Sequence, residues 1–167
     1  MIGERAVGRR SGGRVARRGL VGRLLLVCAV ASVGACEKHE FEPPDRDDQV
    51  VDAGLAYSAA LFDTIAWPGD SIRALDGNVV FSTYCRNCHG TLGRGATEYA
   101  IDRDLEVPSL VAEGWRFAAS PDSVHHKIFV GHSQGMPTWG VAGLTPREID
   151  AVTHYILDVL RPELLGG

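Results

Sequence analysis

The chain has 167 residues, of which 45% are apolar and 23% charged. This composition argues against general disorder and against a multi-span membrane protein, and the length is too short for a two-domain enzyme with its own nucleotide fold. The formal net charge of −4 hides an uneven distribution, because seven arginines and one glutamate precede Cys36. The remainder has 10 basic and 20 acidic residues, which argues against unaided binding to nucleic acid and favours basic protein partners.

The first 35 residues have the layout of an export signal. Arginines precede an apolar run at 24–35, which is followed directly by Cys36. These twelve residues fall short of the ~20 that a membrane-spanning helix needs, so a transmembrane anchor is the weaker interpretation. The sequence VGAC at 33–36 resembles the lipobox of bacterial lipoproteins. That resemblance implies cleavage before Cys36 and acylation of this residue; the alternative is an ordinary signal peptide with an incidental cysteine.

Residues 36–69 are expected to connect the lipid anchor to the folded domain. The segment 37–48, EKHEFEPPDRDD, is charged, contains proline and has no apolar period, which favours a solvated tether. From Val51 to Ala66, apolar residues recur at helical spacing. They predict a short helix that packs on the surface of the domain and ends before Trp67.

Two further helices are predicted on either side of an irregular middle region. The first begins at Asp70 and runs into a pair of cysteines. The second has Ser120 as its N-cap and ends at Gly131, and the adjacent histidines at 125–126 are expected on its solvated side. Between the two helices, residues 90–120 are rich in glycine, aspartate and arginine and show no periodicity.

The clearest helix signal lies near the C-terminus. Thr145 is a suitable N-cap, Pro146 suits the first helical position, and Glu148 completes a capping box. Apolar residues follow at helical spacing from Ile149 to Val159. No strand pattern is present in the sequence, so the predicted fold class is all-α.

Cys85, Cys88 and His89 form the motif Cys-x-x-Cys-His. This motif is the attachment site of c-type haem, in which both thiols add to the haem vinyl groups and the adjacent imidazole binds the iron. A zinc site would need a second pair of ligands, and a thioredoxin-like pair would need a preceding strand and a βαβ pattern. We therefore predict one covalently bound haem c.

With these motifs the chain resembles the class I (mitochondrial-type) cytochromes c in their short bacterial form. The resemblance covers residues 70–161. It rests on Gly77, Phe81, Cys85, Cys88, His89 and Gly90, on Val107, Pro108, Ser109 and Leu110, on Gly131, Met136 and Pro137, and on Tyr155. It implies the class I cytochrome c fold, with three to five helices around one haem in a domain at residues 70–163. It also implies that the first and last helices cross closely at Gly77 and Tyr155.

The resemblance further implies the ligands of the iron. His89 would be the proximal ligand and Met136 the distal ligand. The carbonyl of Pro108 would accept a hydrogen bond from His89 and fix the orientation of its ring. His132, which lies in the same loop as Met136, is the main alternative for the distal position. Elsewhere in the chain, an arginine at 116 and a tryptophan at 139 are candidates for contacts with the haem propionates.

Iron with both axial positions filled offers no open site for substrate or dioxygen, so the expected activity is single-electron transfer rather than enzymatic catalysis. The protein would act on the periplasmic side of a bacterial membrane, tethered through Cys36 in a respiratory chain, with redox partners that carry a basic docking patch. The main alternative is a permanent haem subunit of a larger membrane oxidoreductase. A haem-based ligand sensor and a peroxidase-type enzyme are further alternatives.

Overall fold

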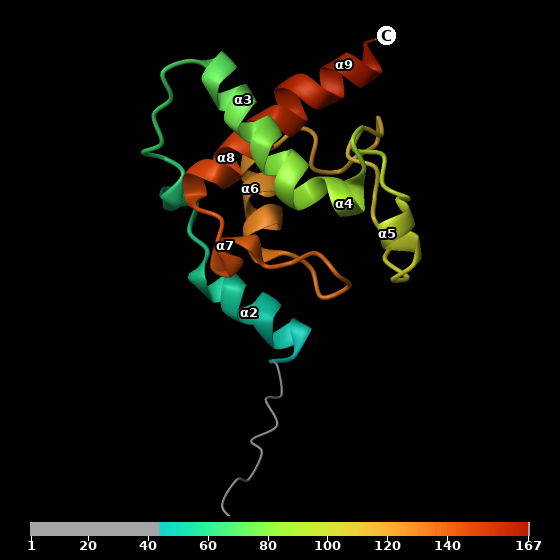
Figure 1. Cartoon of the computed structure of the whole chain (residues 1–167). Helices are drawn as coiled ribbons and strands as arrows, with labels where there is room; N and C mark the ends of the chain where they lie inside the picture. The colour runs from blue at the N-terminus through green and yellow to red at the C-terminus, as the bar shows by residue number, and fades with distance from the viewer. Residues whose placement is uncertain (1–43, 167) are drawn as a thin grey trace, which may run out of the picture. The chain divides into compact units, whose positions relative to one another are not determined.

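The computed structural model describes residues 44–166, and all regular structure within them is helical (Figure 1). The helices are α2 (Arg46–Ala56), α3 (Asp70–Val80), α4 (Arg86–His89), α5 (Glu98–Ile101), α6 (Pro121–Val130), α7 (Trp139–Ala142), α8 (Pro146–His154) and α9 (Arg161–Leu165). A 3-10 turn, Ala59–Leu61, follows α2. None of the helices in this part of the chain is long and apolar enough to cross a membrane.

Two π-helical segments lengthen the helices at the centre of the fold. Phe81–Cys85 joins α3 to α4, and Tyr155–Leu160 joins α8 to α9. Each of these runs is continuous, so the described residues form about six separate helices. The all-α prediction is confirmed. The described residues contain about six helices rather than the three to five expected, because the one-turn helices α5 and α7 are among them.

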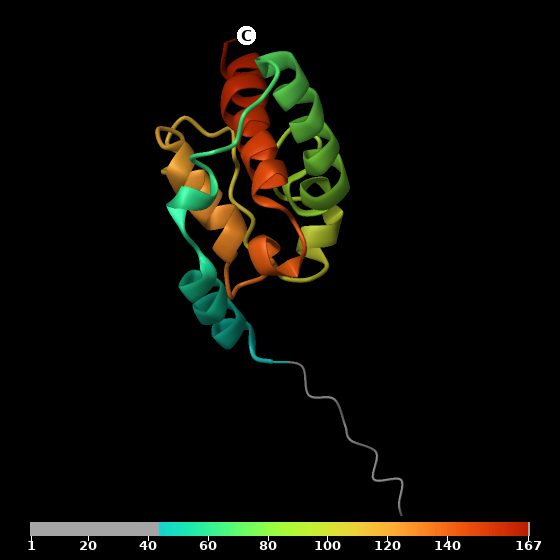
Figure 2. The same cartoon turned by 90° about the vertical axis from the view of Figure 1, so that its left-hand side faces the viewer.

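The crossing of α3 and α8 holds the two long helices together (Figure 2). Gly77 faces α8 so closely that a Cβ on it would overlap the carbonyl oxygen of Ala151 and lie 2.7 Å from the Cβ of Tyr155. A residue without a side chain allows this approach of two backbones. One turn further along, Phe81 packs on Tyr155 with ring centroids 5.5 Å apart. The predicted crossing at Gly77 and Tyr155 is confirmed.

The helix ends follow the capping signals of the sequence. The hydroxyl of Thr145 accepts a hydrogen bond from the N–H of Glu148, and the carboxylate of Glu148 accepts one from the N–H of Thr145. Ser120 caps α6, which ends at Gly131. Asp70 differs slightly, because it is the first residue of α3 rather than its cap.

Helix α2 lies earlier in the chain than predicted. It begins after Asp45, whose carboxylate accepts a hydrogen bond from the N–H of Asp47 at 2.8 Å, and it ends at Ala56. The prediction of a helix continuing to Ala66 is therefore wrong. Acidic residues that suggested a solvated tether instead occupy the N-cap and first turn, where the helix dipole favours negative charge. The predictions for residues 1–35, for Cys36 and for the first part of the tether fall outside the described residues.

A buried carboxylate fastens residues 57–69 to the helical core. Asp150 on α8 accepts hydrogen bonds from the indole Nε1 of Trp67 at 2.7 Å and from the guanidinium of Arg73 at 2.6 Å. The Nε2 atom of His125 lies 3.3 Å from the same carboxylate. One side chain of α8 thus contacts the N-terminal segment, α3 and α6.

His125 is buried, so the prediction that it lies on the solvated side of its helix is wrong. Its imidazole stacks face to face on the ring of Phe62, with centroids 4.1 Å apart and an interplanar angle of 4°. The neighbouring His126 is exposed and meets the edge of Tyr57. The error arises because the segment that carries Phe62 was expected to continue a helix, whereas it crosses the outer side of α6.

Replacing Gly77 with alanine should lower the free energy of unfolding by about 1–3 kcal/mol, because the new methyl group would overlap the backbone of α8. Gly54 offers a matched control: it lies in α2, and a methyl group added to it would meet nothing within 4 Å. Gly54→Ala should raise stability by about 0.5–1 kcal/mol through helix propensity. Urea denaturation followed by circular dichroism measures both effects. Equal midpoints for Gly77→Ala and the unsubstituted protein would contradict the crossing.

Asp150 should make stability depend on pH below about pH 4. Burial raises the pKa of Asp150, but its contacts with His125, Arg73 and Trp67 outweigh this effect and hold the pKa at about 2, below the ordinary 3.8. Because the folded-state pKa is the lower one, the stabilisation is complete above about pH 3.8 and is lost as the pH falls towards 2. The shift corresponds to about 2 kcal/mol at neutral pH.

Asp150→Asn should therefore destabilise the protein by at least that amount at pH 7, and its difference from the unsubstituted protein should shrink between about pH 4 and pH 2. Asp158→Asn is the control, because Asp158 is 62% exposed and pairs only with His154 among the described residues. Denaturation midpoints across this pH range provide the measurement. A constant difference between Asp150→Asn and the unsubstituted protein would show that the carboxylate does not titrate as described.

Candidate functional site

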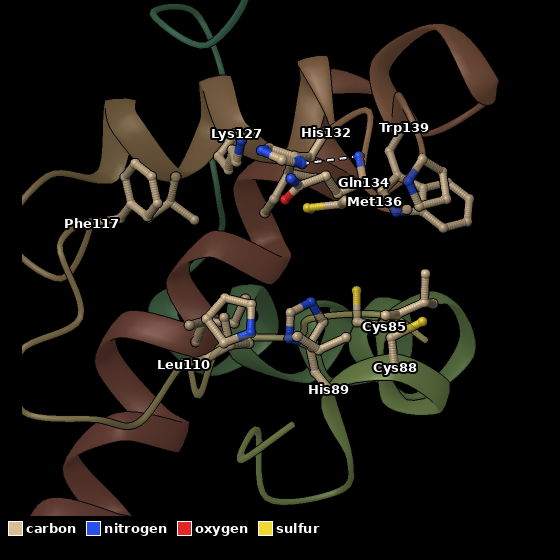
Figure 3. A pocket seen from close by; sticks show the side chains of 18 of the residues that line it. Cys85, Cys88, His89, Leu110, Phe117, Lys127, His132, Gln134, Met136 and Trp139 are labelled. Atoms are coloured by element: carbon tan, nitrogen blue, oxygen red, sulfur yellow. Dashed lines mark hydrogen bonds between the residues drawn. The ribbon is translucent and has the colours of Figure 1, made fainter. Parts of the chain in front are cut away.

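A cavity of about 560 Å³ lies between two walls that come from different parts of the chain (Figure 3). Cys85, Cys88 and His89, at the end of the long helix that begins with α3, form one wall. His132 and Met136, in the loop between α6 and α7, lie on the opposite wall. The volume is within the range of small-molecule and cofactor sites, about 300–1,000 Å³. The structure therefore brings the motif residues and both candidate distal ligands to one site.

Apolar side chains from three parts of the chain line the interior of this cavity. Val124 and Ile128 project from α6, Ile156 from the π segment after α8, and Leu110 from the loop before α6; all four are buried. The sequence periodicity marked the α6 and α8 residues as core residues without showing that they surround a cavity. Their arrangement suits a large cofactor with apolar faces.

Both thiols of the cysteine wall are free in the structure. Burial, and to a smaller extent the nearby Cys88, raises the pKa of Cys85 to about 12. Burial also raises the pKa of Cys88, and Arg103 opposes this effect. Thiols of this kind stay protonated at neutral pH, unlike the low-pKa cysteines of thiol redox enzymes. The thioredoxin-like alternative is therefore disfavoured by electrostatics as well as by the absence of strands among residues 44–166.

The loop after His89 turns back under the cysteine wall. The N–H of Gly95 donates to the carbonyl of His89 at 2.8 Å, and the N–H of Leu110 donates to the carbonyl of Gly93, also at 2.8 Å. Gly95 has a φ of 70°, and a Cβ on it would overlap the carbonyl of Val107. These contacts bring the segment 107–110 alongside His89, although many residues separate the two in sequence.

Pro108 consequently lies next to the His89 ring. Burial lowers the pKa of His89, and the carbonyl of Pro108 has a smaller, opposite effect as a hydrogen-bond acceptor. The Nδ1 atom of His89 is buried and has no hydrogen-bond partner within the described residues. The imidazole thus lies in a low-dielectric site beside the Pro108 carbonyl, and it lines the cavity.

The opposite wall is a tight loop built on Gly131. This residue has a φ of 72°, and a Cβ on it would lie 2.6 Å from the carbonyl oxygen of Met136. The N–H of His132 donates to that same carbonyl at 2.9 Å, and the Nδ1 atom of His132 accepts a hydrogen bond from the N–H of Gln134 at 3.1 Å. In a neutral imidazole this bond places the ring hydrogen on Nε2, so neither nitrogen of His132 keeps a free lone pair.

An aromatic pair and a pair of cations also line the cavity. Tyr84 and Trp139 meet edge to face at the cysteine side, with ring centroids 5.2 Å apart. Arg116 and Lys127 supply the two cations, and the pKa of Lys127 is lowered by burial and by Arg116. Sequence reasoning marked Arg116 and Trp139 as candidates but missed Tyr84 and Lys127. Contacts between distant segments create both pairs, and no spacing rule within the sequence would have revealed them.

Residues 72–156, just over half of the chain, match the family model described as cytochrome c oxidase, cbb3-type, subunit III. The chain belongs to this family. Membership confirms the cytochrome c fold. It also confirms that the domain is of an electron-transfer type rather than an enzymatic type. A cytochrome c domain implies covalently bound haem c.

The relatives are longer proteins. The cbb3-type cytochrome c oxidase subunit CcoP of Rhodobacter capsulatus is 29% identical over 133 residues, which cover 76% of this chain and 40% of the relative. The cbb3-type cytochrome c oxidase subunit FixP of Azorhizobium caulinodans is 31% identical over 91 residues, or 54% and 29% of the two chains. This member of the subunit III family therefore spans less than half the length of these relatives. No solved structure gives a significant match to it.

Proposed function

We propose that this chain is an electron-transfer subunit that carries one haem c and belongs to a membrane oxidase complex of the cbb3 type. The observation that supports this most directly is the cavity itself, in which a Cys-x-x-Cys-His wall faces a methionine loop. The match to subunit III and to CcoP favours a permanent haem subunit over a freely diffusing carrier. The sensor and peroxidase alternatives need an open axial position, which a methionine ligand would close.

The residues present fit a covalent haem c. Cys85 and Cys88 would hold it through thioether bonds, and the buried apolar lining would exclude water from its faces. Arg116 and Lys127 supply positive charge for the two carboxylates of the cofactor. When bound, haem c supplies a single iron centre that takes up and releases one electron.

His89 would serve as the proximal ligand with Pro108 as its partner. A hydrogen on Nδ1 directed to the Pro108 carbonyl would leave the lone pair of Nε2 for the metal. The buried Nδ1 atom has no hydrogen-bond partner in the described part of the chain, so it is available for this bond. This geometry supports the assignment of Pro108 that the sequence resemblance implied.

Met136 is favoured over His132 as the distal ligand. The Nδ1 atom of His132 already accepts the N–H of Gln134, so its ring hydrogen lies on Nε2 and a metal bond would require a different tautomer. The thioether of Met136 has no hydrogen to displace, and its backbone is fixed by the Gly131 turn. A thioether opposite an imidazole raises the reduction potential of haem iron.

We also propose the membrane attachment and domain organisation inferred from the sequence. Residues 1–35 would form a lipoprotein signal, Cys36 would carry the lipid, 36–69 would connect the lipid to the haem-binding region, and 70–163 would hold the haem. The last part of this connection, 57–69, packs against the haem-binding region. The chain would then act on the periplasmic side of the membrane. Its acidic composition supports redox partners with a basic docking patch and not nucleic acid. Metabolic labelling with a fatty acid, abolished by Cys36→Ser, tests the anchor.

The Cys85→Ala/Cys88→Ala double variant should lose its haem on extraction with acidified acetone, because no covalent bond would retain it. The unsubstituted protein should keep its haem in the precipitate under the same treatment. Absorbance of the supernatant and of the precipitate measures the distribution. Haem retained by the double variant would contradict attachment through these two cysteines.

Met136→Ala should remove the weak thioether-to-iron band of the oxidised protein, lower its reduction potential and let carbon monoxide bind the reduced form. The reason is that neutral sulfur stabilises reduced iron relative to oxygen or nitrogen donors. His132→Ala is the matched control and should leave all three properties unchanged. Visible spectra and redox titration provide the measurements. If the band survives in Met136→Ala and disappears in His132→Ala, the histidine is the ligand.

The proposed place in an oxidase complex predicts that the chain will sediment with oxidase activity. Native membranes solubilised in mild detergent and separated on a sucrose gradient provide the test, with covalent haem staining to locate this chain. A subunit should co-migrate with the oxidase at raised ionic strength, because permanent interfaces are more apolar than transient redox contacts. Migration at its own molecular mass would support the free carrier instead.

A further inference from the structure

We propose that Tyr84 and Trp139 form an aromatic latch that joins the two walls of the cavity and keeps Met136 in place. The inference rests on the proposed function, because it assigns these residues a role toward the methionine ligand. Neither residue belongs to the motifs that attach the cofactor or bind the metal. Both are positioning residues in this proposal.

The latch is a direct contact between the two walls. The ring centroids of Tyr84 and Trp139 are 5.2 Å apart at an interplanar angle of 65°, an edge-to-face arrangement that aromatic pairs favour. Tyr84 immediately precedes Cys85, and Trp139 follows Met136 by three residues. Both rings line the cavity. The contact therefore links the cysteine wall to the methionine loop beside the residues that would hold the cofactor.

Trp139 is fixed firmly to its own wall. Its N–H donates to the carbonyl of Pro137 at 3.0 Å, and its carbonyl accepts the N–H groups of Gly143 and Leu144 at 3.1 and 2.9 Å. The next residue, Gly140, lies so close to the ring of Phe129 that a Cβ there would overlap it. The backbone that carries the Trp139 ring is thus held by several contacts, so a contact made by this ring acts directly on the end of the methionine loop.

Tyr84 is fixed on the other wall by the long helix. It lies in the π segment Phe81–Cys85, whose first residue is buried against Tyr155. Tyr84 itself is 42% exposed, and its ring contacts that of Trp139, whereas Phe81 makes the contact with Tyr155 at the crossing. Removing the Tyr84 ring should therefore disturb the latch without disturbing the helix crossing.

A side chain from another segment packs against the far flank of the methionine loop. Gly135 has a φ of 128°, and a Cβ on it would lie 2.5 Å from the side chain of Leu105. Leu105 thus lies against one flank of the loop, and Trp139 follows the other flank. Loss of the latch removes the aromatic contact between this second flank and the cysteine wall, and the population in which the two walls separate beside Met136 should rise.

The test compares three tyrosine variants of the haem-loaded protein. Tyr84→Leu should raise the rate at which carbon monoxide binds the reduced protein by roughly three- to tenfold, the factor that one aromatic pair is worth. Tyr84→Phe should behave as the unsubstituted protein, because the hydroxyl donates no hydrogen bond within residues 44–166 and the ring contact is kept. Tyr99→Leu is the control: Tyr99 is also 42% exposed but packs on Arg103 away from the cavity.

A second comparison distinguishes loss of the latch from a general loss of stability of the fold. Trp139→Leu should raise the rate similarly, and combining it with Tyr84→Leu should add little, because both variants remove the same contact. Urea midpoints of Tyr84→Leu and Tyr99→Leu should agree, whereas only the former should weaken the thioether-to-iron band.

The outcomes separate the latch from the ligand assignment. If Tyr84→Leu binds carbon monoxide no faster than Tyr99→Leu while Met136→Ala binds it rapidly, Met136 is the ligand and the latch is wrong. If the unsubstituted oxidised protein shows no thioether-to-iron band, the ligand assignment fails and the latch fails with it. A rise in rate that Tyr84→Phe shares with Tyr84→Leu would also overturn the proposal, because the ring contact would not be its cause.

Discussion

The contact between Gly77 and the backbone of α8 is the constraint on which the arrangement of the cavity depends. It sets the distance and angle between two continuous helices. The cavity-lining residues of these helices lie in the turns that follow the contact. Cys85 follows Gly77 by about two turns on one helix, and Ile156 directly follows Tyr155 on the other. A side chain at the crossing would separate the helices and widen the cavity on the cysteine side.

Asp150 makes the segment before α3 part of the folded domain. The family match begins at residue 72, yet Trp67 and Phe62 pack against groups on α8 and α6 within the matched region. A buried carboxylate is costly unless its oxygens are paired, and here an indole N–H and a guanidinium satisfy them. Residues 57–69 consequently pack against the outer side of α6, and the inner side of α6 faces the cavity.

Much of the fold could be predicted because its signals are local. The caps at Ser120 and Thr145 and the Cys-x-x-Cys-His motif need only a few adjacent residues to be recognised. The glycine at the crossing was recognised through family resemblance. The one-turn helices α5 and α7 were missed because four residues are too few to show a period of 3.6. The remaining errors concern contacts between distant segments: the burial of His125 depends on Phe62, and the edge-to-face pair at the cavity depends on residues from different walls.

The π-helical segment Phe81–Cys85 has a consequence for how such a site can change during evolution. A π turn contains one residue more than an α turn, so it is equivalent to a single insertion absorbed within a helix. Losing one residue together with the π turn would therefore leave the later side chains in the same orientation, with Cys85 and Cys88 still facing the cavity. Regular α-helical winding of the same number of residues would instead rotate every later side chain by about 100° around the helix axis. Cys85 and Cys88 would then face away from the cavity, although their own spacing would be unchanged. The length of the helix upstream of the motif and the π turn within it must therefore change together.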